Sequence, residues 1–387
     1  MPSSPTPVNG FSQTFVERER LLLADYAMAG AASQGRKHAE PSHPYRSPFQ
    51  RDRDRIVHST AYRRLSGKTQ VFTREMGDFH RTRLTHTYEV ASVSRTLGRA
   101  LRLNEDLIEA LALMHDIGHP PFGHAGEDVL DECVKAHSVV ENAGPGEVGF
   151  SHNRQALRIV EIIEQRYPEF SGLNLSHEVL EGQQTRAQKR AAVQRPLLEA
   201  QVVDAADSTA YDTHDVDDAL HLGLLTMDEL AEVPLFREAT SRVKARYAAL
   251  DTGELKRCIL HELLDWQVSD LLTCTLERLE TWGIESIEQV RQAQTIVRPN
   301  DELFALKAEL EKFLYARVYR HPTVVASRLV AQQQLREMFA AFMAKPELMP
   351  KSFQDRIATY GAARSVCDYL AGMTDRFAQQ EYRKLFP

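Results

Sequence analysis

The sequence predicts an all-α fold, and three observations carry this prediction. Apolar residues recur at helical spacing along most of the chain, most clearly in residues 84–103. Strand and helix patterns do not alternate, which argues against a parallel α/β architecture. The best strand candidate, residues 69–73, is short and β-branched, so we expect at most one small β-hairpin, around residues 65–80.

The predicted elements can be placed in chain order. Residues 1–14 are expected to form a flexible tail, because the first ten are rich in Pro and Ser and lack an apolar core. Asn104, followed by two acidic residues, predicts a helix start, and Gly118 with two prolines just beyond predicts the end of that helix. We expect helices at residues 15–28, 84–103, 104–118, 125–136, 153–166, 189–210, 215–220 and 227–230, followed by amphipathic segments with breaks near residues 298–301 and 345–350.

Composition excludes several classes of protein. The chain has 387 residues, 47 of them Lys or Arg and 54 Asp or Glu, so its formal charge is −7 and gives no general attraction to nucleic acid or anionic membranes. Its four cysteines form no Cys-x-x-Cys pair, which argues against a zinc ribbon or a disulfide scaffold and favours a reducing cytoplasm. No run of 18 apolar residues is present, so we expect no membrane span.

Four of the fifteen histidines lie between positions 86 and 124. His86 is near the start of one predicted helix, and His115 is near the end of the next. A short connection at Asn104 makes these helices antiparallel neighbours, so the two imidazoles should lie at the same level. Asp116 adjoins His115 at the helix end, where neighbouring side chains can grip one cation. The sequence therefore predicts a shared site for these three residues.

A fourth ligand is expected from the segment Val202-Val-Asp-Ala-Ala-Asp207. Asp207 is the best candidate, since a carboxylate on a helix rich in Ala and Val needs a charge partner, and Asp204 competes with it. Tyr211 and Asp215 follow at i+4 and i+8 and share the stripe of Asp207. Two imidazoles and two carboxylates without a thiolate suit Mn²⁺, Mg²⁺, Fe²⁺, Ni²⁺ or Co²⁺ about as well as Zn²⁺.

A structural alternative stands beside this metal site. A buried His-Asp pair is more often a hydrogen bond than a metal centre, and Asp207 taken alone fits a carboxylate on a helix surface. The hairpin geometry, together with an acid on an apolar helix, favours the metal centre.

Several segments carry a family resemblance. The strongest are Arg81-Thr-Arg-Leu-Thr-His86, His115-Asp-Ile-Gly-His-Pro-Pro-Phe-Gly-His-Ala-Gly-Glu127 and Asp204-Ala-Ala-Asp207. Further pieces agree: Ala61-Tyr-Arg-Arg-Leu-Ser-Gly-Lys-Thr-Gln-Val-Phe72, Phe150-Ser-His-Asn153 and Cys367-Asp-Tyr-Leu-Ala-Gly-Met-Thr-Asp375. On these segments the sequence resembles the HD superfamily of metal-dependent phosphohydrolases, and more closely its deoxyguanosine triphosphate triphosphohydrolase group, over about residues 45–385.

The resemblance implies a fold, an activity and a set of partners. It implies an HD-domain helical core at residues 15–230, with a C-terminal helical region at residues 231–387 packed on it. It implies a cytoplasmic enzyme that hydrolyses dGTP or several deoxynucleoside triphosphates to a deoxynucleoside and tripolyphosphate, using a divalent metal ion. Relatives commonly form homo-oligomers. A nucleotide activator, single-stranded nucleic acid as a partner, and the base preference are left open, and no membrane partner is expected.

The resemblance also implies catalytic residues. A general acid must protonate the leaving 5′ oxygen, and His124 is the leading candidate, because the preceding Gly/Pro-shaped turn can aim it at the metal. Glu127 would orient or charge-balance His124, or it is a plain carboxylate at a helix N-terminus. His119 is expected either to contact the phosphates or to stabilise the turn by a hydrogen bond. Which of the three is acid, base or nucleophile is left open.

Substrate contacts are implied in the same way. Arg83 would bind phosphate through its planar guanidinium, with His152 as a phosphate neighbour. Tyr211 would pack against C2′ of the sugar, and Asp215 and Gln70 would hydrogen-bond the 3′-hydroxyl. The structural alternatives are a core tyrosine for Tyr211 and a helix cap for Asp215.

Two groups of residues and two other functions stay open at this point. A phosphate contact and a solvated or salt-bridged surface are both open for Arg63, Arg64 and Lys68, and a place in the pocket or in a subunit contact is open for Tyr315, Tyr319, Arg320 and His321. An HD-type nucleotidase or phosphodiesterase would keep the metal and change the substrate. A sensor would bind a nucleotide or nucleic acid without turnover.

Overall fold

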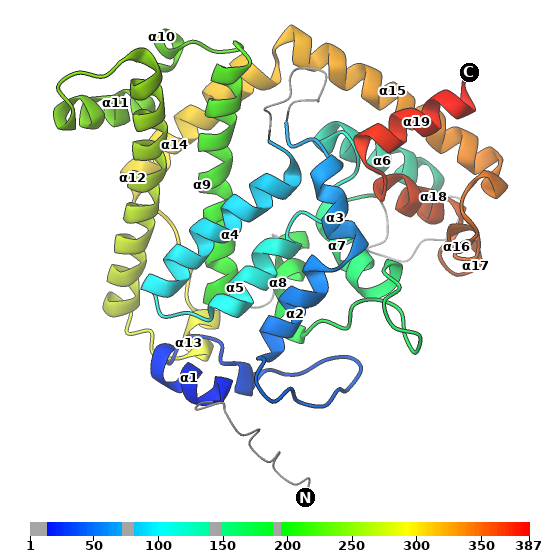
Figure 1. Cartoon of the computed structure of the whole chain (residues 1–387), viewed down its shortest axis with the longest axis horizontal. Helices are drawn as coiled ribbons and strands as arrows, with labels where there is room; N and C mark the ends of the chain where they lie inside the picture. Colours follow the sequence, from blue (N-terminus) through cyan, green and yellow to red (C-terminus); the bar gives the residue numbers. More distant parts are fainter. Residues whose placement is uncertain (1–13, 72–80, 139–148, 189–194) are drawn as a thin grey trace, which may run out of the picture.

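The computed structural model of the chain (Figure 1) describes residues 14–71, 81–138, 149–188 and 195–387. These residues form helices joined by loops, and β-pairing among them is limited to isolated bridges, one of which joins Thr69 to Thr82. The prediction of an all-α fold is therefore confirmed. The predicted hairpin falls largely on residues 72–80, which lie outside the described part.

The helices follow one another along the chain as α1 (Phe15–Leu22), η1 (Gly30–Ala32), α2 (Pro48–Val57), α3 (Thr60–Arg64), η2 (Leu65–Gly67), α4 (Arg83–Ala100), α5 (Glu105–Met114), α6 (Gly123–Ser138), α7 (His152–Arg158), η4 (Ile159–Ile163), α8 (His177–Ala187), α9 (Leu198–His221), α10 (Met227–Leu230), α11 (Pro234–Arg246), α12 (Thr252–Thr281), α13 (Ile287–Gln292), α14 (Asp301–Leu314), η5 (Tyr315–Tyr319), α15 (Pro322–Ala344), η6 (Pro346–Leu348), α16 (Lys351–Gln354), α17 (Ile357–Tyr360), α18 (Ala362–Ala371) and α19 (Asp375–Leu385).

The hairpin of α4 and α5 follows from local chemistry. The Thr82 hydroxyl accepts from the backbone of Thr85 and starts α4, and the Asn104 side chain accepts from the backbone of Leu107 and starts α5. Gly98 lets the helices approach, because a Cβ at this position would lie 2.2 Å from a methyl carbon of Ile108. The predicted cap at Asn104 is confirmed, and the short connection sets α4 beside α5.

Several helices differ from the sequence prediction: α2 and α3 were not predicted, α5 ends at Met114 rather than at residue 118, and α9, α1 and α8 differ as follows. The predicted break at residues 211–214 is wrong, because α9 runs through it without interruption. This segment contains no Gly or Pro to end the helix, and residues 212–214 are buried. Helix α1 ends at Leu22 rather than at residue 28, since it buries no residue that would hold another turn. Helix α8 was not predicted. Its sequence is mostly polar and gives no sign that Gly182 packs closely against α5, where a Cβ would lie 2.4 Å from a methyl carbon of Leu111.

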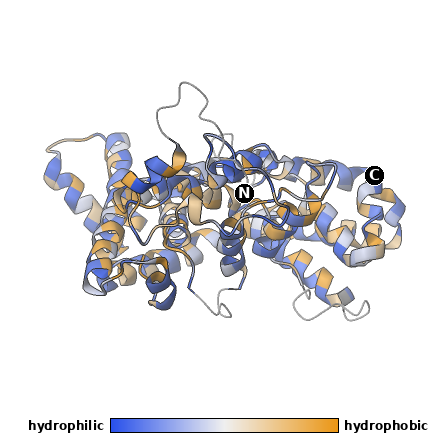
Figure 2. Cartoon of the chain, turned by 90° about the horizontal axis from the view of Figure 1, so that it is seen from below, coloured by the Kyte–Doolittle hydropathy of each residue, from blue (hydrophilic) through white to orange (hydrophobic). Residues whose placement is uncertain are grey.

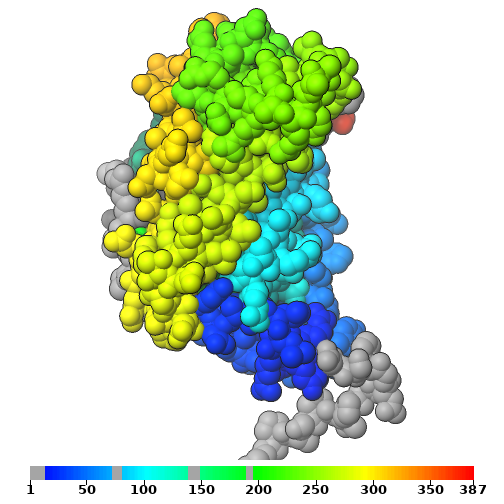
Figure 3. Space-filling view, turned by 90° about the vertical axis from the view of Figure 1, so that its left-hand side faces the viewer, coloured from blue at the N-terminus to red at the C-terminus, as the bar shows by residue number. Residues whose placement is uncertain are grey.

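Three apolar clusters hold the helices together. A central cluster joins α2, α4, α5, α8 and the first half of α9, and a second joins α6, α15, α18 and α19. A third packs α11, α12 and α14 around the C-terminal half of α9, which runs beside α12 (Figure 1). Figure 3 shows one side of the molecule, where the N-terminal segment, the α4–α5 region and the α12–α13 region adjoin although they are far apart in sequence. Since apolar clusters cross residue 230, the boundary between residues 15–230 and 231–387 stays a prediction.

Apolar and polar residues are mixed along the helices that can be seen in Figure 2. Among the described residues, no helix combines the length and the apolar character needed to cross a membrane.

Candidate metal centre and histidine cluster

Four predicted ligands meet where three helices converge. His86 lies on α4, His115 and Asp116 follow the end of α5, and Asp207 lies on α9. His86 Nε2 is 3.1 Å from Asp207 Oδ1, and His115 Nε2 is 3.6 Å from the same oxygen and 3.4 Å from Asp116 Oδ1. One donor atom each from His86, His115 and Asp116 falls within 4.8 Å of the others. The structure thus brings the four side chains together, and their role as metal ligands stays a prediction.

The ring of His115 is oriented for coordination. Its Nδ1 lies 2.6 Å from the carbonyl oxygen of Ala112, which can only accept, so Nδ1 carries the proton. Its Nε2 therefore bears a lone pair, and this buried atom has no hydrogen-bond partner among the residues that the structure describes. Burial also lowers the pKa of His115, which keeps the imidazole neutral. A buried, unpartnered nitrogen is costly unless a ligand satisfies it, so the residues present fit a divalent cation.

The ring of His86 is oriented by a chain of side chains that the sequence analysis missed. Glu89 lies 3.0 Å from His214 Nε2, and since a carboxylate only accepts, this nitrogen carries the proton. His214 Nδ1 is then free to accept from His86 Nδ1 at 3.3 Å. Burial lowers the pKa of His86, but the hydrogen bond to Asp207 outweighs it and raises the pKa. Without metal, a proton on Nε2 faces Asp207, and a bound cation would replace that proton.

Both candidate carboxylates are held by arginines. Arg83 donates to Asp116 at 2.9 Å, and Arg186 on α8 donates to Asp207. Burial would raise the pKa of Asp116, but the neighbouring Arg83 guanidinium holds it well below its usual range, and the pKa of Asp207 is depressed in the same way by the Arg186 guanidinium and by the hydrogen bond to His86. Both groups are therefore carboxylates at neutral pH.

Asp204 was the competing candidate for the fourth ligand. It contacts Arg186 at 3.2 Å, but its side chain is 47% exposed, whereas that of Asp207 is 24% exposed. The short distances to His86 and His115 belong to Asp207, so the geometry favours Asp207 as the ligand.

Replacing His214 by alanine is expected to weaken metal binding. Loss of the partner for Nδ1 frees the tautomer and the rotation of His86, and removal of such an outer partner typically weakens metal affinity about 10- to 100-fold. Calorimetric titration with Mn²⁺ measures this effect. His221→Ala, at the exposed end of the same helix, is the matched control and should leave the affinity unchanged. Equal affinities of the two variants would contradict the orienting role of His214.

A second cluster adjoins the candidate metal centre and contains the predicted catalytic residues. Donor atoms of His119, His124, Glu127 and His152 all lie within 4.8 Å of one another. Glu127 holds the cluster together, since its carboxylate lies 3.0 Å from His124 Nδ1 and 2.8 Å from His152 Nδ1 and also accepts from the backbone N–H of His152. These hydrogen bonds outweigh burial and hold the pKa of Glu127 well below its usual range.

His119 connects the two groups of residues. Its Nδ1 lies 3.1 Å from Asp116 Oδ1, and its ring stacks on that of His152 with centroids 3.8 Å apart. Burial lowers the pKa of His119 well below its usual value, so the ring is neutral. The cluster of His119, His124, Glu127 and His152, called the histidine cluster below, therefore touches the candidate metal centre through one shared carboxylate.

A cavity of about 260 Å³ opens beside the histidine cluster, slightly below the usual size range of ligand pockets. Its lining comes from the segment before α4, from α6 and α9, and from η5 and α15: Thr69, Gln70, Val71, Phe122, His124, Ala125, Tyr211, Tyr315, Tyr319, Ser327, Arg328 and Ala331. Within the described part of the chain, the buried side-chain oxygen of Gln70 has no hydrogen-bond partner, so it could accept from a ligand. Tyr211 and Tyr319 line the cavity with ring centroids 6.2 Å apart. The structure thus places His124, Gln70 and Tyr211 around one space.

Asp215 lies next to this cavity rather than on its wall. It is buried, it accepts a hydrogen bond from the Tyr319 hydroxyl, and burial raises its pKa to about 7. The lining contains Tyr319 in its place, so a ligand in the cavity meets the tyrosine that Asp215 holds.

Two predicted phosphate contacts have other partners in the structure. Arg83 is 2% exposed, pairs with Asp116 and is absent from the cavity wall. Lys68 is buried, and its ammonium donates to the carbonyl oxygens of His119 and Ala371. The alternatives for Lys68 were a phosphate contact and a solvated or salt-bridged surface, and its burial contradicts the surface position. By donating to these two carbonyl oxygens, the Lys68 ammonium instead joins the segment of His119 to the end of α18 inside the protein.

Sequence reasoning missed Arg186, His214, Tyr319 in its link to Asp215, and the hydrogen bonds of Lys68. None of these has a local pattern that marks it. A charged or aromatic residue on a mostly buried helix face, as at His214, is the one signal that was available.

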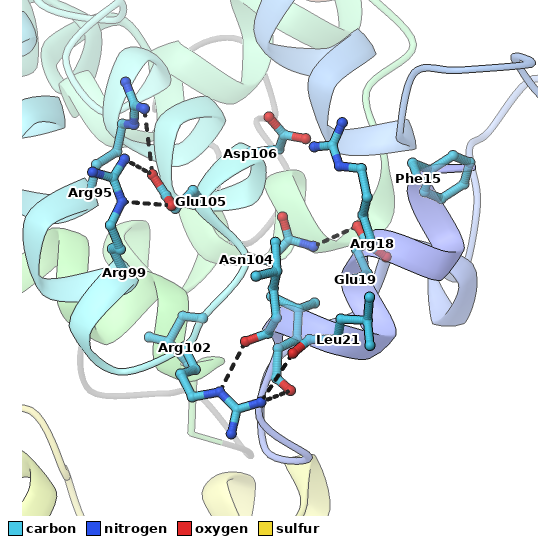
Figure 4. Close-up of a pocket in the computed structure, with 13 residues that line it drawn as sticks. Phe15, Arg18, Glu19, Leu21, Arg95, Arg99, Arg102, Asn104, Glu105 and Asp106 are labelled. Atoms are coloured by element: carbon cyan, nitrogen blue, oxygen red, sulfur yellow. Dashed lines mark hydrogen bonds and ion pairs between the residues drawn. The ribbon is translucent and has the colours of Figure 1, made fainter. Parts of the chain in front are cut away.

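A larger pocket lies away from both groups of residues. It has a volume of about 540 Å³ and lies between α1 and the α4–α5 connection (Figure 4). Its charged side chains are largely paired with one another or with the backbone: Arg95 and Arg99 contact Glu105, Asn104 donates to Glu19, and Arg102 donates to carbonyls of residues 21–23. Size alone therefore does not identify the candidate site.

Comparison with known proteins places both groups of residues in a family context. Residues 83–212 match the family described as HD domain, and residues 297–384 match the phosphohydrolase-associated domain. Curated proteins named deoxyguanosinetriphosphate triphosphohydrolase-like protein are similar to nearly the whole chain. The protein from Bordetella pertussis is 43% identical over 94% of this chain and 96% of its own length, and that from Geobacter sulfurreducens is 40% identical over 95% and 96%. The protein from Brucella anthropi is 43% identical over 96% of each chain.

Proposed function

This chain belongs to the family of deoxyguanosinetriphosphate triphosphohydrolase-like proteins and carries its HD domain, and on that premise we propose that it hydrolyses deoxynucleoside triphosphates to a deoxynucleoside and tripolyphosphate. Membership in the HD family supports a metal-dependent phosphohydrolase. One observation supports the finer proposal: His119 of the histidine cluster contacts Asp116 of the candidate metal centre, and His124 of the same cluster lines a cavity of limited size.

The candidate ligands would hold the cation, and two neighbouring arginines would orient the ligand carboxylates. His86, His115, Asp116 and Asp207 are the proposed metal ligands. A divalent cation bound there would act as a Lewis acid on a phosphate oxygen and make a water molecule more acidic. Arg83 and Arg186 fix the two carboxylates, so the donor atoms are oriented before any substrate arrives.

His124 is proposed as the general acid that protonates the leaving 5′ oxygen. Its Nδ1 faces the Glu127 carboxylate, which would accept a hydrogen bond from this nitrogen and orient the ring. The proton to be delivered would then come from Nε2. Because His124 lines the cavity beside Gln70 and Tyr211, the acid would stand between the phosphates and the sugar.

The walls of the cavity suggest how a deoxyribose would be selected. The unpartnered oxygen of Gln70 can accept from a 3′-hydroxyl, and the rings of Tyr211 and Tyr319 can pack against the sugar. Tyr319 is held in place by its hydrogen bond to Asp215. A rigid aromatic wall leaves little room for an added 2′-hydroxyl, and a site built on a hydrogen bond to the 3′-hydroxyl rejects analogues that lack it.

The experiment is a product assay with each of the four deoxynucleoside triphosphates, singly and mixed, in Mn²⁺ and in Mg²⁺. We expect tripolyphosphate and a deoxynucleoside by ion-exchange chromatography, and no turnover after removal of metal by a chelator. Release of inorganic phosphate or a deoxynucleoside monophosphate would contradict the proposal and support a nucleotidase or phosphodiesterase. Binding without any turnover would support a sensor. Activity that appears only in mixtures would reveal a nucleotide activator.

A further inference from the structure

The C-terminal helices α18 and α19 reach the loops that carry the histidine cluster. Asp375, the first residue of α19, is largely buried and uses both carboxylate oxygens. Its Oδ2 accepts from the backbone N–H and the hydroxyl of Thr69, and its Oδ1 accepts from the backbone N–H of Phe122 at 2.9 Å. One side chain therefore ties the segment before α4 to the turn that leads to His124.

That turn needs an external support. Phe122 and Gly123 both adopt positive φ angles, of 62° and 61°, and such a conformation is unfavourable for a phenylalanine. The next turn of α6 is also crowded, since a Cβ at Gly126 would lie 2.1 Å from the carbonyl oxygen of Pro121. His124 follows directly, so its position depends on how firmly the Phe122 backbone is held.

A second aspartate secures the helix that carries His152. Asp368 on α18 is 1% exposed, and it accepts from Gln155 at 3.1 Å and from Arg158 at 2.6 Å. Both donors lie on α7, which begins at His152. The carboxylate on α18 therefore fixes the helix from which His152 reaches Glu127.

A third tie joins the same parts of the chain. Lys68, next to Thr69, bridges the carbonyl oxygen of Ala371 at the end of α18 and that of His119. Through Asp375, Asp368 and Lys68, helices α18 and α19 are thus tied by hydrogen bonds to each segment that carries a residue of the histidine cluster. Among the described residues, the side-chain hydrogen bonds of Asp368 and Asp375 go to α7, Phe122 and Thr69, and none goes to the four predicted metal ligands.

We propose that Asp375 and Asp368 are positioning residues for the histidine cluster, through which the C-terminal helices set the acid-base geometry while leaving metal binding to α4, α5 and α9. This inference rests on the proposed function, because it assigns these two aspartates to the same reaction. It gives a task to the C-terminal motif Cys367-Asp-Tyr-Leu-Ala-Gly-Met-Thr-Asp375, whose two acidic residues are these anchors.

The test uses the full chain with Asp375→Asn and Asp368→Asn as separate variants. An asparagine at 375 keeps one carbonyl acceptor for two backbone donors, so the N–H of Thr69 or of Phe122 loses its partner. We expect kcat for the cleaved nucleotide to fall about 10- to 100-fold, the scale expected for displacements near 1 Å, while the Mn²⁺ affinity stays within about twofold. Asp52→Asn is the matched control, because Asp52 is fully buried and serves Arg36 and Ser176 instead.

A second readout keeps the inference separate from the proposed activity. Amide hydrogen exchange of residues 119–127, followed by mass spectrometry, should accelerate in Asp375→Asn and stay unchanged in Asp52→Asn. If the unaltered protein releases no tripolyphosphate, the proposed function fails, and exchange alone then decides whether Asp375 holds the turn. Unchanged exchange and kcat in both variants would overturn the inference. A parallel loss of Mn²⁺ affinity would overturn it too, since it would indicate general disruption rather than positioning.

Discussion

Asp207→Asn is expected to lose at least about 100-fold in Mn²⁺ affinity, and hydrolysis at ordinary metal concentrations with it. The substitution keeps the size of the side chain but removes the charge beside His86 Nε2 and His115 Nε2. Loss of an outer partner of a ligand already weakens affinity about 10- to 100-fold, so loss of a ligand's own charge should exceed that range. Calorimetric titration with Mn²⁺ and elemental analysis of the purified variant measure the effect.

Asp204→Asn is the matched control for this experiment. Asp204 lies one turn earlier on α9 and contacts the same arginine, Arg186, but its side chain is largely exposed. We expect this variant to bind Mn²⁺ with nearly the affinity of the unaltered protein. If the control loses metal and Asp207→Asn retains it, the assignment of the fourth ligand is reversed. If neither loses metal, the proposed centre is wrong.

His124→Ala is expected to reduce kcat by about 100- to 10,000-fold, the range typical of a lost general acid. The metal should remain bound, because the four predicted ligands lie on other elements, α4, α9 and the end of α5. The measurement is turnover of the preferred deoxynucleoside triphosphate, together with the metal content of the same sample. The acid should also be visible in the pH dependence of kcat, whose limb for the protonated group disappears in the variant.

The control for this variant comes from the same helix. His137 lies near the opposite end of α6, where its Nδ1 bonds the carbonyl oxygen of Cys133. His137→Ala should therefore change stability slightly and turnover little. A His124→Ala protein with full activity would remove His124 from the chemistry and shift attention to His119.

Much of the candidate site could be predicted because it depends on local rules. The cap at Asn104 and the short connection after α4 made the hairpin predictable, and the hairpin implied that His86 and His115 would meet. Asp207 stood out because an acid on an Ala-rich and Val-rich helix needs a partner.

The rest depended on contacts between distant segments. Arg186 reaches Asp207 from α8, a helix whose polar sequence gave no signal, and Asp375 reaches Phe122 from the far end of the chain. The role of Lys68 was left open, and only the tertiary structure shows that two backbone carbonyls accept hydrogen bonds from its ammonium. Pairings of this kind are set by packing and leave no periodic trace in the sequence.

The unbroken course of α9 has a consequence for substrate selection. Asp207, Tyr211 and Asp215 stand on one rod, and at about 1.5 Å per residue the first and last are about 12 Å apart along its axis. In the proposed binding mode, the phosphate end and the sugar end of the substrate would therefore contact two levels of a single rigid helix. One residue inserted between Asp207 and Tyr211 would turn Tyr211 by about 100° away from Tyr319, so the spacing of these side chains along α9 cannot increase gradually. Substrate selectivity could therefore change only through substitution of the side chains around this face of α9. In our proposal, recognition depends on the length of the substrate as well as on its chemical groups.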